Sequence, residues 1–169
     1  MGSPQHYSRP YRFTLRSHPA EIAQTTEDVC HFCARQAETG AEHKLRTDSI
    51  DGLRLVLTEA LNNIAEHSYG NKTDQRIAIA LFLDVQPARL QLTVQLRDSG
   101  RFNKHGTIPK ALHIDPEKPF ELPEGGFGLN IMQQLCEELR YYRENEQNYF
   151  ELQLVLEYGR SYPKDPGAS

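Results

Sequence analysis

The segment 59–67 carries three side chains with chemical potential at a spacing of four residues. In a helix, residues four apart lie one turn apart on the same face, so Glu59, Asn63 and His67 form a ladder of carboxylate, carboxamide and imidazole. A carboxylate can accept a proton, and a carboxamide oxygen can hold a hard cation such as Mg²⁺. A solvated helix face would account for the same residues, but two adjacent asparagines are unfavourable within a helix.

A second candidate is Asp98, which ends an apolar stretch and precedes Ser99-Gly100. A carboxylate in this place can accept a hydrogen bond from an exocyclic amine such as that of adenine. An ordinary turn at the end of a strand is the alternative.

The third candidate is the glycine-rich run Gly125-Gly126-Phe127-Gly128, which precedes a predicted helix. Glycines let consecutive backbone N–H groups approach an anion, and a helix N-terminus adds positive potential. The run is neither a Walker loop nor a dinucleotide fingerprint, because the Lys-Ser/Thr ending and the preceding strand are missing. A hinge of a flexible lid is the alternative interpretation.

Hydrophobic periodicity predicts the elements that position these residues. We expect strands at 11–17, 76–85, 90–97, 139–143 and 149–157, and helices at 20–39, 48–68 and 129–138. Gly40 is expected to end the first helix, and Gly70 to end the second in a left-handed conformation. The helix at 48–68 has the strongest pattern, with one apolar arc formed by Leu53, Leu57, Ala60, Leu61 and Ile64. The proline-rich segment 99–124 is predicted to be a functional lid or disordered.

This order lacks the strand–helix alternation of a doubly wound sheet. We therefore predict an α+β fold of two layers, with a mixed, mostly antiparallel sheet and helices on one face. The other face would lie against solvent or a partner. One domain is expected over residues 9–158, with flexible tails at 1–8 and 159–169.

The composition of the chain argues against some classes of partner and cellular location. The chain of 169 residues has a net charge of −4, which argues against nucleic acid or an anionic membrane as the main partner. Neither a membrane-spanning apolar run nor a signal peptide is visible, which indicates a cytoplasmic protein. Cys30 and Cys33 belong to a set of three cysteines and are interpreted as small residues packed on one helix face, rather than as a metal or redox pair.

In their order and spacing, the three motifs resemble those of the GHKL ATPase superfamily. Its N box resembles Glu59-x-x-x-Asn63, and its two glycine boxes resemble Asp98-x-Gly100 and Gly126-x-Gly128. The chain is more similar still to bacterial anti-sigma-factor serine/threonine kinases, through His67-x-Tyr69 and the run Gly-Gly-Phe-Gly-Leu-Asn-Ile-Met at 125–132. The similarity extends over about 11–157.

The resemblance implies a Bergerat-type α/β sandwich that binds ATP and Mg²⁺. Glu59 would be the general base, and Asn63 would bind Mg²⁺ together with the ATP phosphates. Asp98 and Gly100 would belong to the adenine site, and His67 would support the pocket wall. The phosphates would be wrapped by Gly126, Phe127, Gly128 and Leu129.

The chain also departs from the family pattern. Phe102 stands where many members have a second glycine, and Asn148 stands where a threonine often lies beside adenine. Glu124 precedes the glycines where some kinases carry a basic residue, for which Arg101 or Lys104 would substitute. These departures bear on phosphotransfer more than on ATP binding.

The function that the resemblance implies is phosphorylation of a serine or threonine on an anti-anti-sigma (STAS-domain) protein, with a sigma factor as the sequestered target. The oligomeric state is not determined by the sequence, and a homodimer is one alternative because similar kinases often dimerise. One alternative is a regulatory module that binds ATP and a partner without phosphotransfer. Another is a stand-alone histidine-kinase catalytic domain, against which the second glycine box argues.

Overall fold

Five antiparallel strands form the sheet in the computed structural model, which describes residues 9–102 and 127–159. Their order across the sheet is β1-β2-β3-β5-β4. The bounds are β1 (Tyr11–Arg16), β2 (Arg76–Val85), β3 (Arg89–Asp98), β4 (Glu138–Glu144) and β5 (Gln147–Glu157). The α+β class is confirmed, although the described strands contain no parallel pair of the kind that a mixed sheet allows. Because β5 lies between β3 and β4, it brings Asn148 directly opposite Asp98.

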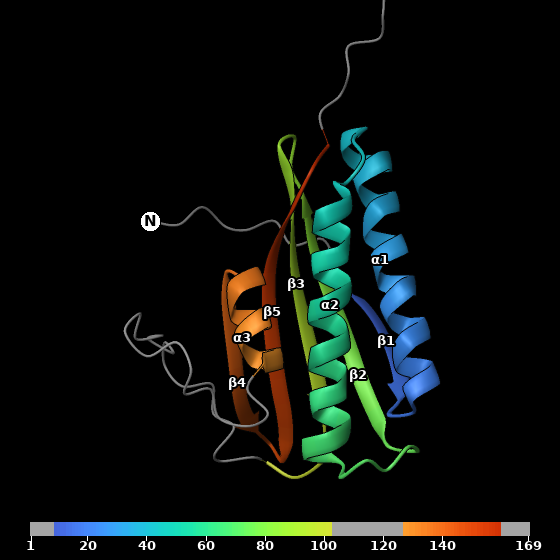
Figure 1. Cartoon of the computed structure of the whole chain (residues 1–169), viewed down its shortest axis with the longest axis vertical. Coiled ribbons are helices and arrows are strands. Elements are labelled where there is room, and N and C mark those ends of the chain that lie inside the picture. Colours follow the sequence, from blue (N-terminus) through green and yellow to red (C-terminus); the bar gives the residue numbers. More distant parts are fainter. Residues whose placement is uncertain (1–8, 103–126, 160–169) are drawn as a thin grey trace, which may run out of the picture.

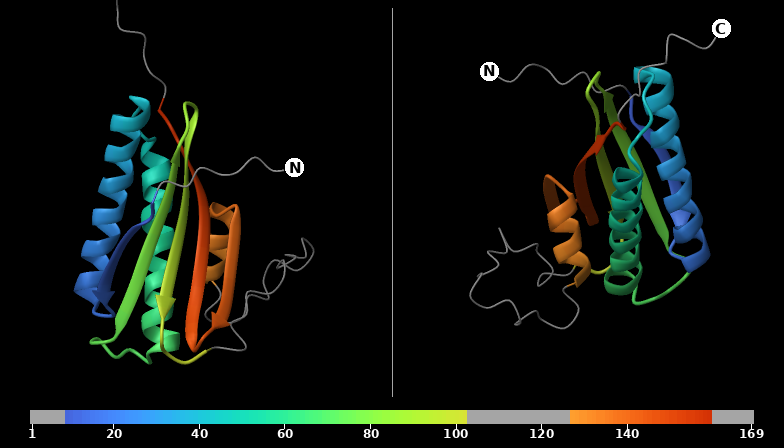
Figure 2. Two further views of the ribbon diagram at one scale, coloured as in Figure 1. Left: turned by 180° about the vertical axis from the view of Figure 1, so that it is seen from behind. Right: turned by 45° about the horizontal axis from the view of Figure 1, so that its top comes forward.

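The helices pack on one face of this sheet (Figures 1 and 2). They are α1 (Pro19–Ala41), α2 (Thr47–Asn63), which continues into the π-helical turn η1 (Ile64–Ser68), and α3 (Phe127–Leu135). The prediction that Gly40 ends the first helix is wrong, because α1 continues to Ala41 and Glu42 takes the left-handed conformation with φ 57°. A Cβ at Gly40 would lie 2.9 Å from the Val85 side chain, so this glycine permits close packing against the end of β2.

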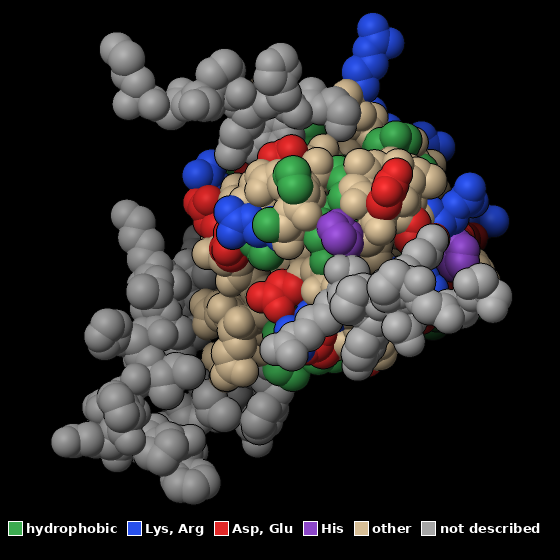
Figure 3. Space-filling view, turned by 90° about the horizontal axis from the view of Figure 1, so that it is seen from above, with side chains coloured by type: hydrophobic (Ala, Val, Ile, Leu, Met, Phe, Trp, Pro, Cys, Tyr) green, Lys and Arg blue, Asp and Glu red, His purple; other side chains and the backbone are tan. Residues whose placement is uncertain are grey.

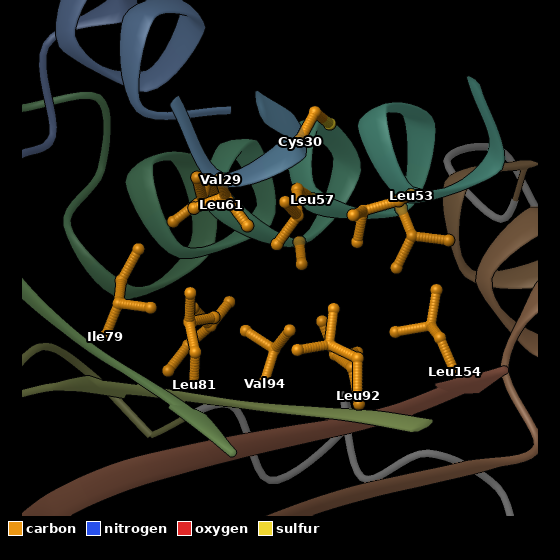
Figure 4. Packing of buried hydrophobic residues seen from close by; sticks show 14 of the residues in the cluster. Val29, Cys30, Leu53, Leu57, Leu61, Ile79, Leu81, Leu92, Val94 and Leu154 are labelled. Carbon is orange, nitrogen blue, oxygen red and sulfur yellow. The ribbon is translucent and has the colours of Figure 1, made fainter. Parts of the chain in front are cut away.

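The core lies between α2 and the sheet. Figure 4 shows Leu53, Leu57 and Leu61 of α2 pointing toward the strands. Side chains alternate along each strand, so β2, β3 and β5 present one continuous apolar face to the helix, with Leu81 opposite Val94. The predicted apolar arc of this helix is confirmed, since all five of its residues are buried. Burying each leucine stabilises the fold by about 1.5–3 kcal/mol.

The three cysteines are buried and free, and Cys30 and Cys33 belong to the core as predicted. Burial raises the pKa of the Cys30 thiol to about 11 and that of Cys33 to about 12. These thiols therefore stay protonated at neutral pH, which suits a packing role. Within residues 9–102 and 127–159, no group of three metal-ligating side chains comes together.

Other expectations concern the surface and the ends of the chain. None of the described helices is long and apolar enough to cross a membrane. Acidic and basic side chains are interspersed over the end of the molecule seen in Figure 3. The expected tails, apart from Gly159, and residues 103–124 of the expected lid lie outside the described residues.

Candidate functional site

The candidate residues gather toward one end of the sandwich, the lower end in Figure 1. There α2 passes into η1, β3 ends at Asp98, and β4 turns into β5. The start of α3 is close by, because α3 runs antiparallel to α2 with Leu135 beside Gly52. Since both helices advance by about 1.5 Å per residue, Phe127 lies about level with residue 60 of α2. The fold therefore brings all three motifs to the same region.

Glu59 and Asn63 occupy the last turn of α2, and both are half-buried. Their spacing of four residues places them one turn apart on the same face. Among the described residues, neither side chain makes a hydrogen bond or ion pair, although Glu59 can accept and Asn63 can donate as well as accept. The carboxylate and the carboxamide are thus available to a ligand on this face.

The third residue of the predicted ladder, His67, lies beyond the α-helical part of this segment. Residues Ile64–Ser68 form a π-helical turn, in which Tyr69 N donates to Ile64 O at 3.1 Å across five residues. A π turn contains about one residue more than an α turn, so the side-chain spacing changes here from that of α2. His67 is exposed, whereas Glu59 and Asn63 are half-buried. Gly70 follows with φ 58°, as predicted for a left-handed cap.

The π turn holds the loop that follows Asp98. Arg101 N donates to Ser68 O at 2.9 Å, and Ser99 N donates to the Tyr69 hydroxyl at 3.0 Å. The same hydroxyl donates to the carbonyl of Arg76 at 2.6 Å. A Cβ at Gly100 would lie 2.7 Å from the Ser68 carbonyl carbon, so only glycine fits this close backbone approach. The glycine after Asp98 is therefore required by the packing of the protein itself.

Asp98 is almost completely buried, with 2% of its surface exposed. Its Oδ1 accepts hydrogen bonds from Gly100 N at 2.9 Å and from Asn148 Nδ2 at 2.8 Å, and the Ser68 side chain adds a third bond. Burial raises the pKa of Asp98, while these hydrogen bonds and the positive charge of Arg143 act in the opposite direction. A carboxylate can accept about four hydrogen bonds, so these three leave about one acceptor position without a donor among the described residues.

Two residues that support Asp98 come from the β4–β5 hairpin. Asn148 is fully buried, and Arg143 Nη1 donates to its Oδ1 at 2.7 Å. Sequence reasoning placed Asn148 near adenine only by resemblance and missed both its bond to Asp98 and the part played by Arg143. The register of β5 against β3 and β4, which pairs Asn148 with both Asp98 and Arg143, was the signal that could have found them.

The glycine-rich run is described only from Phe127, where α3 begins, so Gly126 lies outside the described residues. Gly128 and Leu129 belong to the first turn of α3. The first four N–H groups of a helix have no partner within it, which makes this turn a suitable contact for an anion. The Oδ1 atom of Asn130 is buried there and has no donor among the described residues. The unpaired N–H groups of this turn fit an anionic, phosphate-bearing ligand.

Some of the residues that depart from the family pattern lie in the described part of the structure. Phe102 stacks on Tyr141 of β4, with ring centroids 5.4 Å apart and an interplanar angle of 14°. Arg101 is exposed, while Lys104 and Glu124 lie outside the described residues. An aromatic contact therefore occupies the place where many superfamily members have a second glycine.

Comparisons with known proteins agree with this geometry. A family profile described as "Histidine kinase-like ATPase domain" matches residues 18–154. The chain is similar to the "Serine-protein kinase RsbW" of Staphylococcus aureus (strain MRSA252), with 26% identity over 100 residues, which are 58% of this chain and 61% of that protein. A protein of the same name from Bacillus cereus (strain AH187) is 30% identical over 95 residues, which are 55% of this chain and 56% of that protein. The chain thus spans less than two thirds of the length of the curated relatives it matches.

Proposed function

The chain belongs to the histidine kinase-like ATPase domain family, and we propose that it is an ATP-dependent serine/threonine protein kinase that acts as an anti-sigma regulatory factor. Its substrate protein would be an anti-anti-sigma protein with a STAS domain. The observation that carries the proposal is the Glu59 carboxylate, which is half-buried, has no partner among the described residues, and lies level with the start of α3. The residues 9–158 would form one ATP-binding domain.

Each part of ATP has a matching group. The adenine amine would donate to the free acceptor position of Asp98, next to the turn at Gly100. The phosphates would contact the N-terminal turn of α3 and its preceding glycines, from Gly126 to Leu129. Asn63 would hold Mg²⁺ through its carboxamide oxygen, as hard cations prefer oxygen ligands. When bound, Mg²⁺ would neutralise charge on the phosphate oxygens.

Glu59 would act as the general base. Its carboxylate would take the proton of the incoming serine or threonine hydroxyl while the hydroxyl oxygen bonds to the γ-phosphorus. The bond from that phosphorus to the β–γ bridging oxygen breaks, and ADP leaves. Phosphoryl transfer depends mainly on positioning and charge stabilisation, so one base and a backbone cradle are sufficient.

The names of the relatives support this reaction, since both are called serine-protein kinases. The partner, the activity and the place of action remain proposals for this chain. We propose that it acts in the cytoplasm, that a sigma factor is the sequestered target, and that a homodimer is one assembly in which it works.

The test replaces Glu59 with glutamine, which keeps the shape of the side chain but cannot accept the proton at neutral pH. Labelled ATP and a STAS-domain protein encoded beside this chain would be the substrates. We expect Mg-ATP to bind almost normally and phosphate transfer to slow by roughly 10²–10⁴-fold. Glu66→Gln is the matched control, because this exposed carboxylate lies in the adjoining π turn.

The label must appear on an acid-stable serine or threonine of the partner. Transfer that Glu59→Gln leaves unchanged would refute the role of this carboxylate. A parent protein that binds ATP but transfers no phosphate would instead indicate a regulatory module that uses ATP as a ligand.

A further inference from the structure

A line of hydrogen bonds runs from the protein surface to the buried carboxylate of the candidate adenine site. It begins at Arg143, an exposed residue of β4, whose Nη1 donates to Asn148 Oδ1 at 2.7 Å and to Gly100 O at 3.2 Å. It continues from Asn148 Nδ2 to Asp98 Oδ1 at 2.8 Å. Arg143 belongs to none of the three sequence motifs.

The environment of Asn148 fixes the orientation of its side-chain amide. Three acceptors surround Nδ2, because the carbonyls of Gly100 and Arg101 lie 3.2 and 3.3 Å away in addition to the Asp98 carboxylate. The Arg143 donor lies against Oδ1 on the other side. A flipped amide would place its oxygen against all three acceptors and its NH₂ group against a cation. The Asn148 amide can therefore only donate toward Asp98.

Because its amide is fully buried and both ends are engaged, Asn148 is poorly placed to contact a nucleotide itself. We infer that Arg143 and Asn148 are positioning residues, which hold the Asp98 carboxylate so that its free acceptor position meets the amine of an adenine base. This inference rests on the proposed nucleotide site. It assigns base recognition partly to a surface arginine on a strand that carries none of the motifs.

The charged and polar groups around Asp98 support this role. Ser68 faces it from η1 and Tyr69 from the residue after η1. Gly100 N faces it from the turn after β3, Asn148 from β5 and Arg143 from β4. Of these, Arg143 carries a positive charge that acts on Asp98. Its charge favours the ionised carboxylate, which is the form that accepts a hydrogen bond most strongly, against the effect of burial.

A purely structural role for Arg143 would be to hold the turn at residues 98–101 against the hairpin. Such a role would affect stability alone. A positioning role also changes the pH dependence of nucleotide binding and the preference for adenine over guanine, so both should be measured beside stability.

The experiment titrates Mg-ADP and Mg-GDP into the full chain by calorimetry over a range of pH. It compares the parent with Arg143→Met, Arg143→Lys and Arg140→Met. Arg140 is the matched control, since it is an exposed arginine of the same strand whose guanidinium is paired with Glu138 at 2.6 Å. Urea unfolding gives the free energy of unfolding of each variant.

We expect Arg143→Met to weaken ADP binding by about 3- to 10-fold, the scale of one hydrogen bond, with a smaller effect on GDP. Affinity for ADP should fall as Asp98 takes up a proton, and in Arg143→Met this fall should occur at higher pH. Arg143→Lys should restore part of the affinity, and Arg140→Met should behave as the parent.

Equal ADP affinity and equal pH profiles in Arg143→Met and Arg140→Met would overturn the inference and leave the proposed function intact. A parent protein that binds no adenine nucleotide would overturn the proposed function, and the inference with it. Binding of ADP without any phosphate transfer would leave the inference standing and refute only the kinase activity.

Discussion

Replacing Gly100 with alanine tests how closely the Asp98 loop is held against the π turn. An alanine Cβ would lie 2.7 Å from the carbonyl carbon of Ser68 and 2.8 Å from its Cβ. The first of these atoms belongs to the backbone, so the conflict cannot be relieved by turning a side chain. The loop must move away from Ser68 until the contact with the carbonyl carbon reaches the ordinary distance of 3.4 Å. This is a shift of at least about 0.7 Å, because the Ser68 carbonyl oxygen lies nearer still to the added Cβ.

This shift is large enough to break hydrogen bonds. The bond from Arg101 N to Ser68 O would lengthen from 2.9 Å to about 3.6 Å, which is beyond hydrogen-bond range. The bond from Ser99 N to the Tyr69 hydroxyl is expected to weaken with it. Losing two bonds of about 0.5–1.5 kcal/mol each lowers the free energy of unfolding by about 1–3 kcal/mol. Because Gly100 N also donates to Asp98, ADP affinity should fall as well.

Gly52→Ala is the matched control, since it is the same chemical change at a site with room. The added Cβ would lie 3.8 Å from the Leu135 side chain, which is an ordinary contact. Within helix α2, alanine should raise the free energy of unfolding by about 0.5–1 kcal/mol. Urea unfolding and ADP calorimetry would measure both variants. A Gly100→Ala protein with the stability and ADP affinity of the parent would show that the loop does not depend on this close approach.

Two further predictions concern the same loop. Asp98→Asn should weaken ADP binding. Without nucleotide, the free energy of unfolding of this variant minus that of the parent should be higher at neutral pH than at low pH. Because burial raises the folded-state pKa of Asp98, the parent loses stability as the pH rises from the ordinary carboxyl value through that raised pKa, whereas asparagine does not titrate. Urea midpoints between about pH 4 and about pH 8 check the slope, and a constant difference would refute it. Tyr69→Phe should lower the free energy of unfolding by about 1–3 kcal/mol, because Ser99 N and the Arg76 carbonyl lose their partner. A free energy of unfolding of Tyr69→Phe equal to that of the parent would show that water replaces the hydroxyl as a hydrogen-bond partner.

The elements were predictable where burial follows a simple period. The apolar arc of α2 and the alternation along β2 and β5 predicted these elements to within a few residues, since both patterns record which side faces the core. The end of α1 was predicted wrongly, because Gly40 is required by its contact with Val85 and not by a left-handed conformation. A contact between distant elements leaves no periodic signal.

The same limit applies to the candidate site. The types and spacing of Glu59, Asn63 and Asp98 pointed to a nucleotide, and the structure places them toward one end of the fold. Whether they bind one stays a prediction. The π turn was not predictable, because the sequence at 64–68 continues a helical pattern. The line from Arg143 to Asp98 depends on strand order and register, which local patterns do not determine.

The residue proposed to bind the base and the residues proposed to bind the metal and take the proton are held in place to different degrees. Among the described residues, the carboxylate of Asp98 is held by three donors, and its loop is tied to the π turn by backbone bonds. Within the same described residues, Glu59 and Asn63 carry no such bonds on helix α2. The buried charge, which is costly to fold, is therefore held by several donors, while no described residue bonds to the side chains proposed for the proton and the metal. This division favours recognition of the base before the reacting groups are arranged, because the described residues hold only the base-binding carboxylate in place without a ligand.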